Sequence, residues 1–336
     1  MTPNGSLPPP EPQRNAAALN LRPLPLGELL DRAFSIYFRN IVTFSALLAI
    51  VLIPSLLVTY FQTRGIFGWY ISTIQHQISN PHSTPDLSAL NSFAPSDFWT
   101  GIQLLIGFFL IPMSYGAVVV GVSRAYVGLP VTFVDCYRQA LRRWLPVMIL
   151  MLLWIVLAVV LIVAFAIVGG IFGAVGAMIT GVLGSPVLGF FFAVVVIALM
   201  LALIGVIIMI YLTSAISFIS VVLEKIDPIR ALGEAFARVF GGGQFWRGFV
   251  LAIALTGIYL GGSLVIGGGG AVLAFLLKAP AMYIIFAGMM QMFFVPFAVV
   301  TAAVYYYDIR IRREGYDLQM LIDKFASPAS SGASNA

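Results

Sequence analysis

Few side chains in this sequence are of a type that could carry acid–base, nucleophilic or metal chemistry. Both histidines, His76 and His82, lie between residues 63 and 97, together with Asp86 and Asp97. A metal site needs several ligands that converge in a rigid frame, whereas this stretch is rich in Ser, Pro and Asn. No serine–histidine–aspartate set and no pair of carboxylates is placed for catalysis. We therefore expect no catalytic, cofactor or metal site, and a protein that is not an enzyme.

The apolar stretches of the chain carry no ionisable side chain deep inside them. Proton-coupled transporters and pumps rely on such groups within the membrane, so the sequence disfavours a proton pump. The polar side chains that do occur there can hydrogen-bond between helices, for roughly 0.6 kcal/mol each, or line a shallow cavity. They include Ser45, Ser114, Tyr115, Thr213, Ser214, Ser217 and Thr301.

Proline interrupts three of these stretches, at Pro54, Pro112 and Pro296. A proline removes one helical hydrogen bond and bends the helix. Carbonyl groups freed at mid-membrane can bind a ligand, as the broken helices of transporters do. Alternatively, each bend is static and neighbouring groups satisfy its carbonyls. If the protein handles a ligand, we expect the cavity near these three prolines, Ser114 and Thr213.

Long apolar helices must position all of these residues. Apolar residues make up 60% of the 336 and charged residues 9%, whereas soluble domains have roughly 45–50% and about 25%. A bilayer core about 30 Å thick requires about 20 apolar helical residues, and a backbone in lipid must satisfy its own hydrogen bonds. We predict an all-α polytopic membrane protein with six transmembrane helices, at about 41–62, 98–123, 145–169, 187–215, 248–272 and 281–307.

Basic residues are concentrated on one side of these spans. Sixteen of the 18 Lys and Arg residues fall in the N-terminal segment, the second and fourth connections and the C-terminal segment, and the exceptions are Arg64 and Lys278. By the positive-inside rule, both termini are cytoplasmic and the number of spans is even. We expect disordered tails at 1–22 and 326–336, flanking one membrane domain at 23–325. The pI near 9.4 then indicates contact with anionic lipid headgroups rather than with nucleic acid.

An amphipathic helix is expected before the first, third and fifth spans. Apolar side chains recur there at helical spacing, beginning at Leu26, Phe133 and Ile229. These segments are too polar to span a bilayer, so they should lie in its interface on the cytoplasmic side. The chain is therefore predicted to contain three tandem parallel units, 23–123, 130–215 and 228–307. The arginines expected to contact lipid headgroups are Arg32, Arg39, Arg142, Arg143, Arg238, Arg312 and Arg313.

Glycines are frequent in the third and fifth apolar stretches. Gly169 and Gly173, like Gly257 and Gly261, have the four-residue spacing that lets two helices approach closely. Segment 169–186 either forms a re-entrant loop or belongs to two tightly packed helices.

Two segments of the chain resemble a known family. The first is residues 24–34 (LPLGELLDRAF) followed by Tyr37, and the second is residues 306–318 (YYDIRIRREGYDL). Together they resemble the bacterial family named after the membrane domain of glycerophosphoryl diester phosphodiesterases, including its stand-alone members. The resemblance covers roughly residues 22–325 and implies a multi-pass protein of the bacterial cytoplasmic (inner) membrane. In fused relatives the chemistry belongs to a separate barrel domain that this sequence does not contain, so the resemblance implies no enzyme activity.

Two functions are compatible with these features. The first is a non-enzymatic membrane scaffold or accessory module in lipid or envelope metabolism, with membrane lipids and a protein in the membrane as its partners. The alternative is a transporter or lipid-handling protein for a small or amphiphilic substrate. For a scaffold we expect a core in which the glycines let the helices pack closely and leave no cavity, whereas for a transporter we expect a cavity deep in the membrane.

Overall fold

The computed structural model describes residues 24–80, 97–126, 128–183, 186–241 and 243–314. All secondary structure in these ranges is helical. Six helices are long and apolar enough to cross a membrane, so the chain is a multi-pass membrane protein, as predicted. The six spans are Ile41–Gln62, Phe98–Tyr126, Trp144–Val182, Val187–Leu223, Phe245–Leu276 and Ala281–Arg313. The predicted tails at 1–22 and 326–336 lie outside the described residues.

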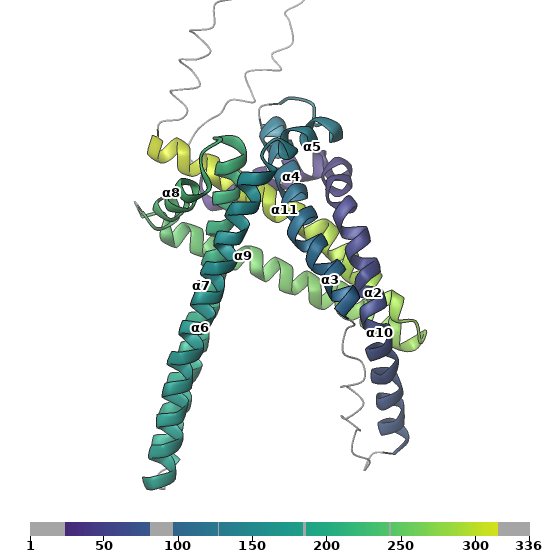
Figure 1. The fold of residues 1–336 in the computed structure, drawn as a ribbon, viewed down its shortest axis with the longest axis vertical. Helices are drawn as coiled ribbons and strands as arrows, with labels where there is room; N and C mark the ends of the chain where they lie inside the picture. Colours follow the sequence, from purple (N-terminus) through teal and green to yellow (C-terminus); the bar gives the residue numbers. More distant parts are fainter. Residues whose placement is uncertain (1–23, 81–96, 127, 184–185, 242, 315–336) are drawn as a thin grey trace, which may run out of the picture.

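Two groups of helices diverge from one end of the molecule (Figure 1). On one side, α6 (Trp144–Leu183) and α7 (Pro186–Leu223) form a long hairpin. On the other side lie α2 (Ile41–Ser79), α3 (Asp97–Leu105) and α4 (Ile111–Tyr126). The divergence leaves most of the hairpin without neighbours from the other described helices.

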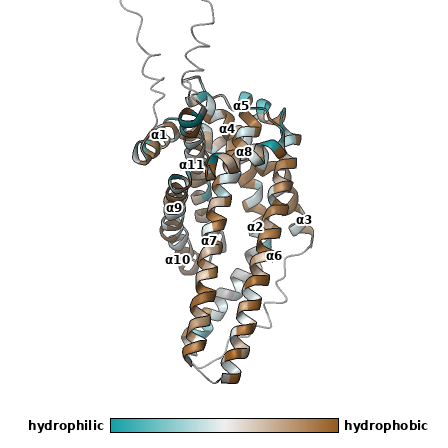
Figure 2. Cartoon of the chain, turned by 90° about the vertical axis from the view of Figure 1, so that its left-hand side faces the viewer, coloured by the Kyte–Doolittle hydropathy of each residue, from teal (hydrophilic) through white to brown (hydrophobic). Residues whose placement is uncertain are grey.

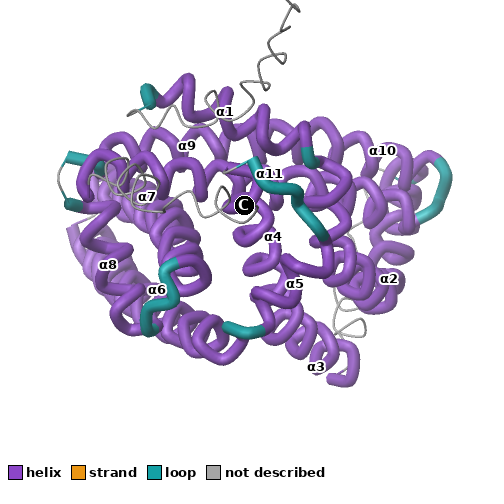
Figure 3. Tube along the Cα trace, turned by 90° about the horizontal axis from the view of Figure 1, so that it is seen from above, coloured by secondary structure: helices purple, strands orange, loops and turns teal. Residues whose placement is uncertain are grey.

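Three further helices join the two groups. α11 (Pro280–Glu314) packs against α2, α4 and α7. α9 (Phe245–Gly262) and α10 (Gly268–Leu276) run along one edge of the molecule, from the hairpin side towards α2 (Figure 3). The large buried side chains concentrate where α4, α7 and α11 meet, and include Leu212, Ile216, Ile219, Tyr305 and Tyr306.

Three short amphipathic helices lie at the same end of the molecule, the end from which the spans diverge, here called the capped end (Figures 1 and 2). They are α1 (Leu26–Arg39), α5 (Phe133–Leu141) and α8 (Pro228–Phe240). Each precedes the span that the sequence predicted. Small side chains on their buried faces allow close packing on the spans, because a Cβ built on Gly116 of α4 would lie only 3.3 Å from Cβ of Ala140 in α5.

The buried face of α1 differs in part from the predicted apolar stripe. Leu29, Ala33 and Tyr37 are buried as the stripe requires, and Ile36 is buried beside them. Phe38, in contrast, is 60% exposed. Only part of the apolar surface of α1 therefore packs against the protein, and the part that includes Phe38 is exposed.

None of the three prolines interrupts its span. Pro54 and Pro296 lie inside the continuous helices α2 and α11. Pro112 is the second residue of α4, which begins directly after the π-helical turn η3 (Ile106–Leu110), where a wider turn replaces α-helical hydrogen bonding. A second π-helical turn, η4 (Ser263–Gly267), joins α9 to α10.

The hairpin is longer than the sequence predicted. At 1.5 Å per residue, the 40 residues of α6 extend about 60 Å, twice the roughly 30 Å core of a bilayer. Figure 2 shows α6 and α7 as predominantly hydrophobic along their length. Residues 169–183 continue α6, so the re-entrant alternative is wrong for the described part of this segment. The helix continues through the glycines because backbone N–H and C=O groups in lipid can be hydrogen-bonded only within a helix.

Close helix packing occurs at other glycines than those predicted. Gly169, Gly173, Gly257 and Gly261 have no atom within 4 Å of a built Cβ. At Gly176, in contrast, a Cβ would lie 2.8 Å from the Phe192 ring of α7. The prediction of tight packing at the two four-residue spacings is therefore wrong, because those glycines face away from the rest of the described chain.

Candidate functional site

A cavity of about 410 Å³ lies where α7, α9 and α11 meet. Its volume falls in the range of about 300–1,000 Å³ typical of small-molecule pockets. All its lining residues belong to membrane spans, and none of these described residues is charged. They are Ile207, Ile208, Tyr211, Leu212, Ala215, Ala252, Leu255, Thr256, Tyr259, Gln291, Phe294, Val295, Ala298 and Ala302.

Helical periodicity explains how three spans create this space. On each of the three helices the lining positions recur every three or four residues, which places them on one face. On α9 and α11 alanines occupy one end of the lining, at Ala252, Ala298 and Ala302, and larger side chains occupy the other. An alanine fills no volume beyond its Cβ, so the three helices can touch and still enclose a cavity between them.

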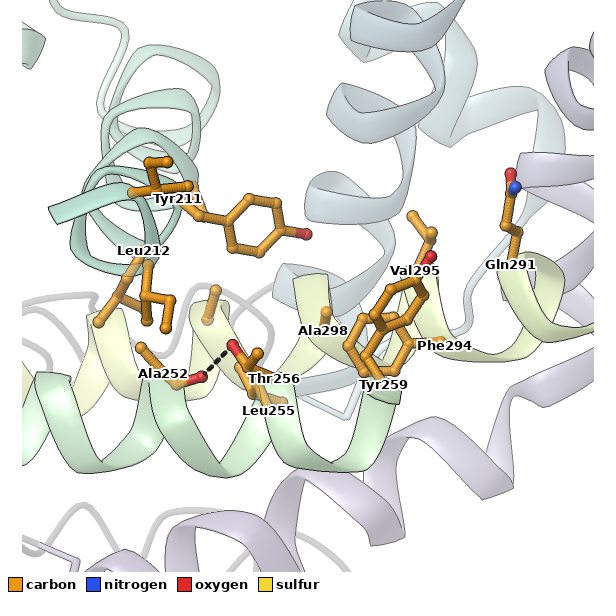
Figure 4. A pocket seen from close by; sticks show the side chains of 14 residues that line it. Tyr211, Leu212, Ala252, Leu255, Thr256, Tyr259, Gln291, Phe294, Val295 and Ala298 are labelled. Carbon is orange, nitrogen blue, oxygen red and sulfur yellow. Dashed lines mark hydrogen bonds between the residues drawn. The ribbon is translucent and has the colours of Figure 1, made fainter. Parts of the chain in front are cut away.

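The polar residues of the cavity lie in the middle part of their spans. Tyr211, Tyr259 and Gln291 each lie within about two helical turns of the midpoint of their span. Figure 4 shows Tyr211 reaching out from α7, Tyr259 and Phe294 close together between α9 and α11, and Gln291 at the far side of the hollow. The Tyr259 and Phe294 ring centroids are 4.8 Å apart.

The four polar side chains differ in whether protein groups satisfy them. Tyr211 shares a hydrogen bond with Tyr115 of α4. The Thr256 hydroxyl donates to the carbonyl oxygen of Ala252, at 2.8 Å and within its own helix. Within the ranges that the structure describes, no hydrogen bond reaches the Tyr259 hydroxyl or the Gln291 amide. The cavity therefore offers apolar walls and two neutral groups that are able to hydrogen-bond a ligand.

The predicted cavity residues do not line this space. Ser114 is buried and hydrogen-bonds the Tyr137 hydroxyl at 2.7 Å, which in turn donates to the Leu47 carbonyl at 2.6 Å. Thr213 is buried and donates to the Met209 carbonyl of its own helix. None of the five residues predicted to lie at a cavity, Pro54, Pro112, Ser114, Thr213 and Pro296, lines this one, and the prediction of a cavity near them stays a prediction.

Two of these residues differ from the lining residues in helix face rather than in position along the helix. Thr213 and Pro296 directly follow Leu212 and Val295, which do line the cavity, and each step along a helix turns the side chain by about 100°. Thr256, Tyr259 and Gln291 were not among the residues predicted to lie at a cavity. The available signal was the position of Gln291, the one amide side chain in the apolar stretch 281–307.

Arg238 does not face lipid headgroups, contrary to the prediction. It is 8% exposed and binds both carboxylate oxygens of Glu224, at 2.7 and 3.1 Å, and the Ser220 hydroxyl at 2.8 Å. Tyr306 also donates to Glu224. The apolar stripe of α8 was misread because Ala231 and Ala235, rather than larger side chains, define its buried face.

Glu224 is ionised in this cluster despite its burial. Desolvation on its own would raise the pKa of the carboxyl group. The hydrogen bonds from Arg238 and Tyr306, with the positive charges of Arg238 and Arg310, outweigh it and lower the pKa below its ordinary value of 4.5. The cluster thus joins the ends of α7, α8 and α11.

The other arginines expected at headgroups have varied surroundings. Arg39 and Arg142 are exposed at the capped end, and their contact with lipid stays a prediction, as does that of Arg143. Arg32 lies over the Tyr126 ring, 4.4 Å from its centroid. Arg312 and Arg313 donate hydrogen bonds to protein groups, although both remain exposed.

The fold and the cavity define a multi-pass helical membrane protein with a lateral cavity between its spans. No protein-family model, no curated protein and no solved structure matches the chain. In the part of the chain that the structure describes, no three His, Cys, Asp or Glu side chains are grouped to hold a metal ion. The function must therefore be argued from the cavity.

Proposed function

We propose that this chain is a non-enzymatic membrane protein that binds a lipid-like amphiphile in the cavity between α7, α9 and α11. The observation that carries the proposal is a cavity of about 410 Å³ within the membrane spans, whose described lining includes no charge. Lipid tails surround such a site, so an apolar ligand can enter from the side without crossing water. We place the protein in a bacterial cytoplasmic membrane, with both termini and the arginines of the capped end in the cytoplasm.

Packing, rather than the hydrophobic effect, must provide the affinity. An apolar chain in the bilayer is already away from water, so entry into the cavity exchanges lipid contacts for protein contacts. Dispersion contacts are individually weak and depend on how well the shapes fit. Reducing the cavity volume should therefore reduce binding without changing any charge.

Native mass spectrometry of the purified protein tests this proposal. We expect the wild-type protein to retain an amphiphile and Ala298→Leu, which adds three carbon atoms beside the cavity, to retain at least fivefold less. Ala164→Leu adds the same atoms to an exposed position of α6 and serves as the matched control. Equal retention by all three proteins, or none by the wild type, would contradict the proposal.

A second candidate function is the scaffold that the sequence favoured, and the hairpin supports it. α6 and α7 expose large apolar side chains along their length, among them Ile162, Ile171, Phe190 and Ile197. A partner protein in the membrane would cover this surface. Cross-linking from Ile171→Cys tests the idea, with Arg142→Cys at the capped end as control. A cross-linked product that contains a second protein and forms only with Ile171→Cys supports the scaffold function. If no such product forms, the scaffold function is rejected.

A further inference from the structure

We infer that the ligand of this cavity is an uncharged amphiphile whose carbonyl or hydroxyl oxygen lies at mid-membrane depth, where Tyr259 and Gln291 bind it. The inference rests on the proposed function and deepens it by naming a class of ligand. Three observations support it: the hydrogen-bonding state of these two side chains, the absence of charge in the described lining, and the aromatic wall.

The first observation is that two polar groups face the cavity without a protein partner. Tyr259 is 38% exposed and Gln291 is exposed, and within the described ranges neither side chain forms a hydrogen bond. In water such groups would be satisfied by solvent, but in a bilayer core an unsatisfied polar group is costly. A ligand oxygen between them removes this cost, and a ligand without one does not.

The second observation is the distance from the cavity to charged residues. Along α9, the cation Arg247 precedes Tyr259 by 12 residues, which is about 18 Å of helix, and along α11 Asp308 follows Gln291 by 17 residues, which is about 25 Å. A phosphate group beside Gln291 would therefore be a charge in the membrane without a counter-ion, which is strongly unfavourable. The acyl tail of a phospholipid has no polar group at this depth. Both parts of a phospholipid thus fail to match the site.

The third observation is the aromatic wall beside the two polar groups. The Tyr259 and Phe294 rings pack together, with centroids 4.8 Å apart, and Tyr211 reaches into the cavity from α7 (Figure 4). Flat rings favour a planar group such as an ester or a ring carbonyl. A prenylated quinone and a diacylglycerol share this chemistry, since each combines a neutral oxygen with long apolar chains.

Competition among named lipids tests the inference. The wild-type protein in phosphatidylcholine nanodiscs is offered dioleoylglycerol, a short-chain prenylated quinone or dioleoylphosphatidylglycerol, and retained probe is measured by native mass spectrometry. We expect at least one neutral probe to be retained about tenfold more than phosphatidylglycerol. The two neutral arms distinguish a quinone from a diacylglycerol.

Variants of the two polar residues identify the binding groups. Tyr259→Phe removes one oxygen and keeps the ring packed on Phe294, and Gln291→Leu keeps the approximate size of the side chain. Each should lower retention of the neutral probe about fivefold and leave that of phosphatidylglycerol unchanged. Thr213→Val is the matched control, because the Thr213 hydroxyl is bonded within α7 and the residue does not line the cavity, and it should behave as the wild type.

Each other outcome overturns a defined part of the argument. Equal retention of neutral and anionic probes refutes the ligand class, while the proposed amphiphile binding stands. If both variants retain as much neutral probe as the wild type, Tyr259 and Gln291 do not bind the ligand, and this part of the inference is refuted. Failure of the wild type to retain any amphiphile refutes the proposed function itself. Size-exclusion chromatography of each variant confirms that the folded protein is being compared.

Discussion

The backbone N–H of Leu24 donates a 2.8 Å hydrogen bond to Oδ1 of Asp308, 284 positions later in the chain. Arg247 and Arg312 complete this arrangement, because each donates to Oδ2 of Asp308 at 2.9 Å and to the Leu24 carbonyl at 2.8 Å. The Asp308 residue is only 1% exposed. These hydrogen bonds thus connect the segment just before α1 to the end of α11.

Asp308→Asn should destabilise the protein by about 2–3 kcal/mol. The amide keeps an acceptor for Leu24 but removes the charge that neutralises two arginines, and breaking a buried ion pair typically costs about 3–5 kcal/mol. We expect a smaller loss of stability than this typical value because the Arg247 and Arg312 side chains are each about a quarter exposed. A lower thermal midpoint in detergent and faster proteolysis near Pro25 would show this effect. Glu234→Gln, which removes a more exposed carboxylate, is the control and should shift the midpoint less.

Stability should fall in acid because Glu224 must be ionised in the folded protein. Its pKa is lowered in the fold, so its contribution is fully present above the ordinary value of 4.5 and is lost as the pH falls through the folded pKa. The thermal midpoint should therefore stay level from pH 7 to about pH 5 and decline at lower pH. Glu224→Gln should lower the midpoint at pH 7 and flatten the decline. A variant as steep as the wild type would show that another group controls the acid response.

Much of the fold follows from hydropathy alone. The first predicted span, 41–62, coincides with the span Ile41–Gln62, and the three amphipathic helices lie where their apolar spacing placed them. The ends of α6 and α7 could not be predicted in the same way. The predicted spans end at residue 169 and begin again at residue 187, whereas α6 continues through the glycines to Leu183.

The candidate site was less accessible to sequence reasoning. Which face of a span meets another span depends on packing, and uniformly apolar helices give no periodic signal for it. Arg238 shows the same limit in a polar segment, since its burial depends on Glu224 arriving from the preceding span. Tyr259 and Gln291 become a site only because α9 crosses α11, which no local pattern indicates.

Gly176→Ala should destabilise the hairpin by about 1–3 kcal/mol. A Cβ at this position would lie 2.8 Å from the Phe192 ring and 2.9 Å from its Cβ, so α6 and α7 must move apart. Gly173→Ala is the matched control, because nothing lies within 4 Å of its built Cβ. Thermal unfolding in detergent should separate the two variants. If Gly173→Ala is equally destabilising, the α6 surface at Gly173 is covered by another molecule.

Cys136, the single cysteine of the chain, should resist thiol reagents in the folded protein. Its side chain is fully buried in α5. Burial raises the pKa of the thiol, and the nearby Arg124 only partly offsets it. Because the thiolate is the reactive form, a membrane-permeant maleimide should label the native protein slowly and the denatured protein fully. Rapid labelling of the native protein would show that α5 detaches from α4 in solution.

An unreactive Cys136 allows the orientation of the chain to be measured with single introduced cysteines. Arg142→Cys places an exposed thiol at the capped end, and Ile78→Cys places one near the far end of α2, where Ile78 is 69% exposed. In intact bacterial spheroplasts, a membrane-impermeant maleimide should label Ile78→Cys but reach Arg142→Cys only after the cells are opened. The basic residues of the capped end are the physical reason, because the positive-inside rule keeps them in the cytoplasm. Labelling of Arg142→Cys from outside would show that the orientation is the reverse, with the Glu224 and Asp308 clusters on the outer face of the membrane.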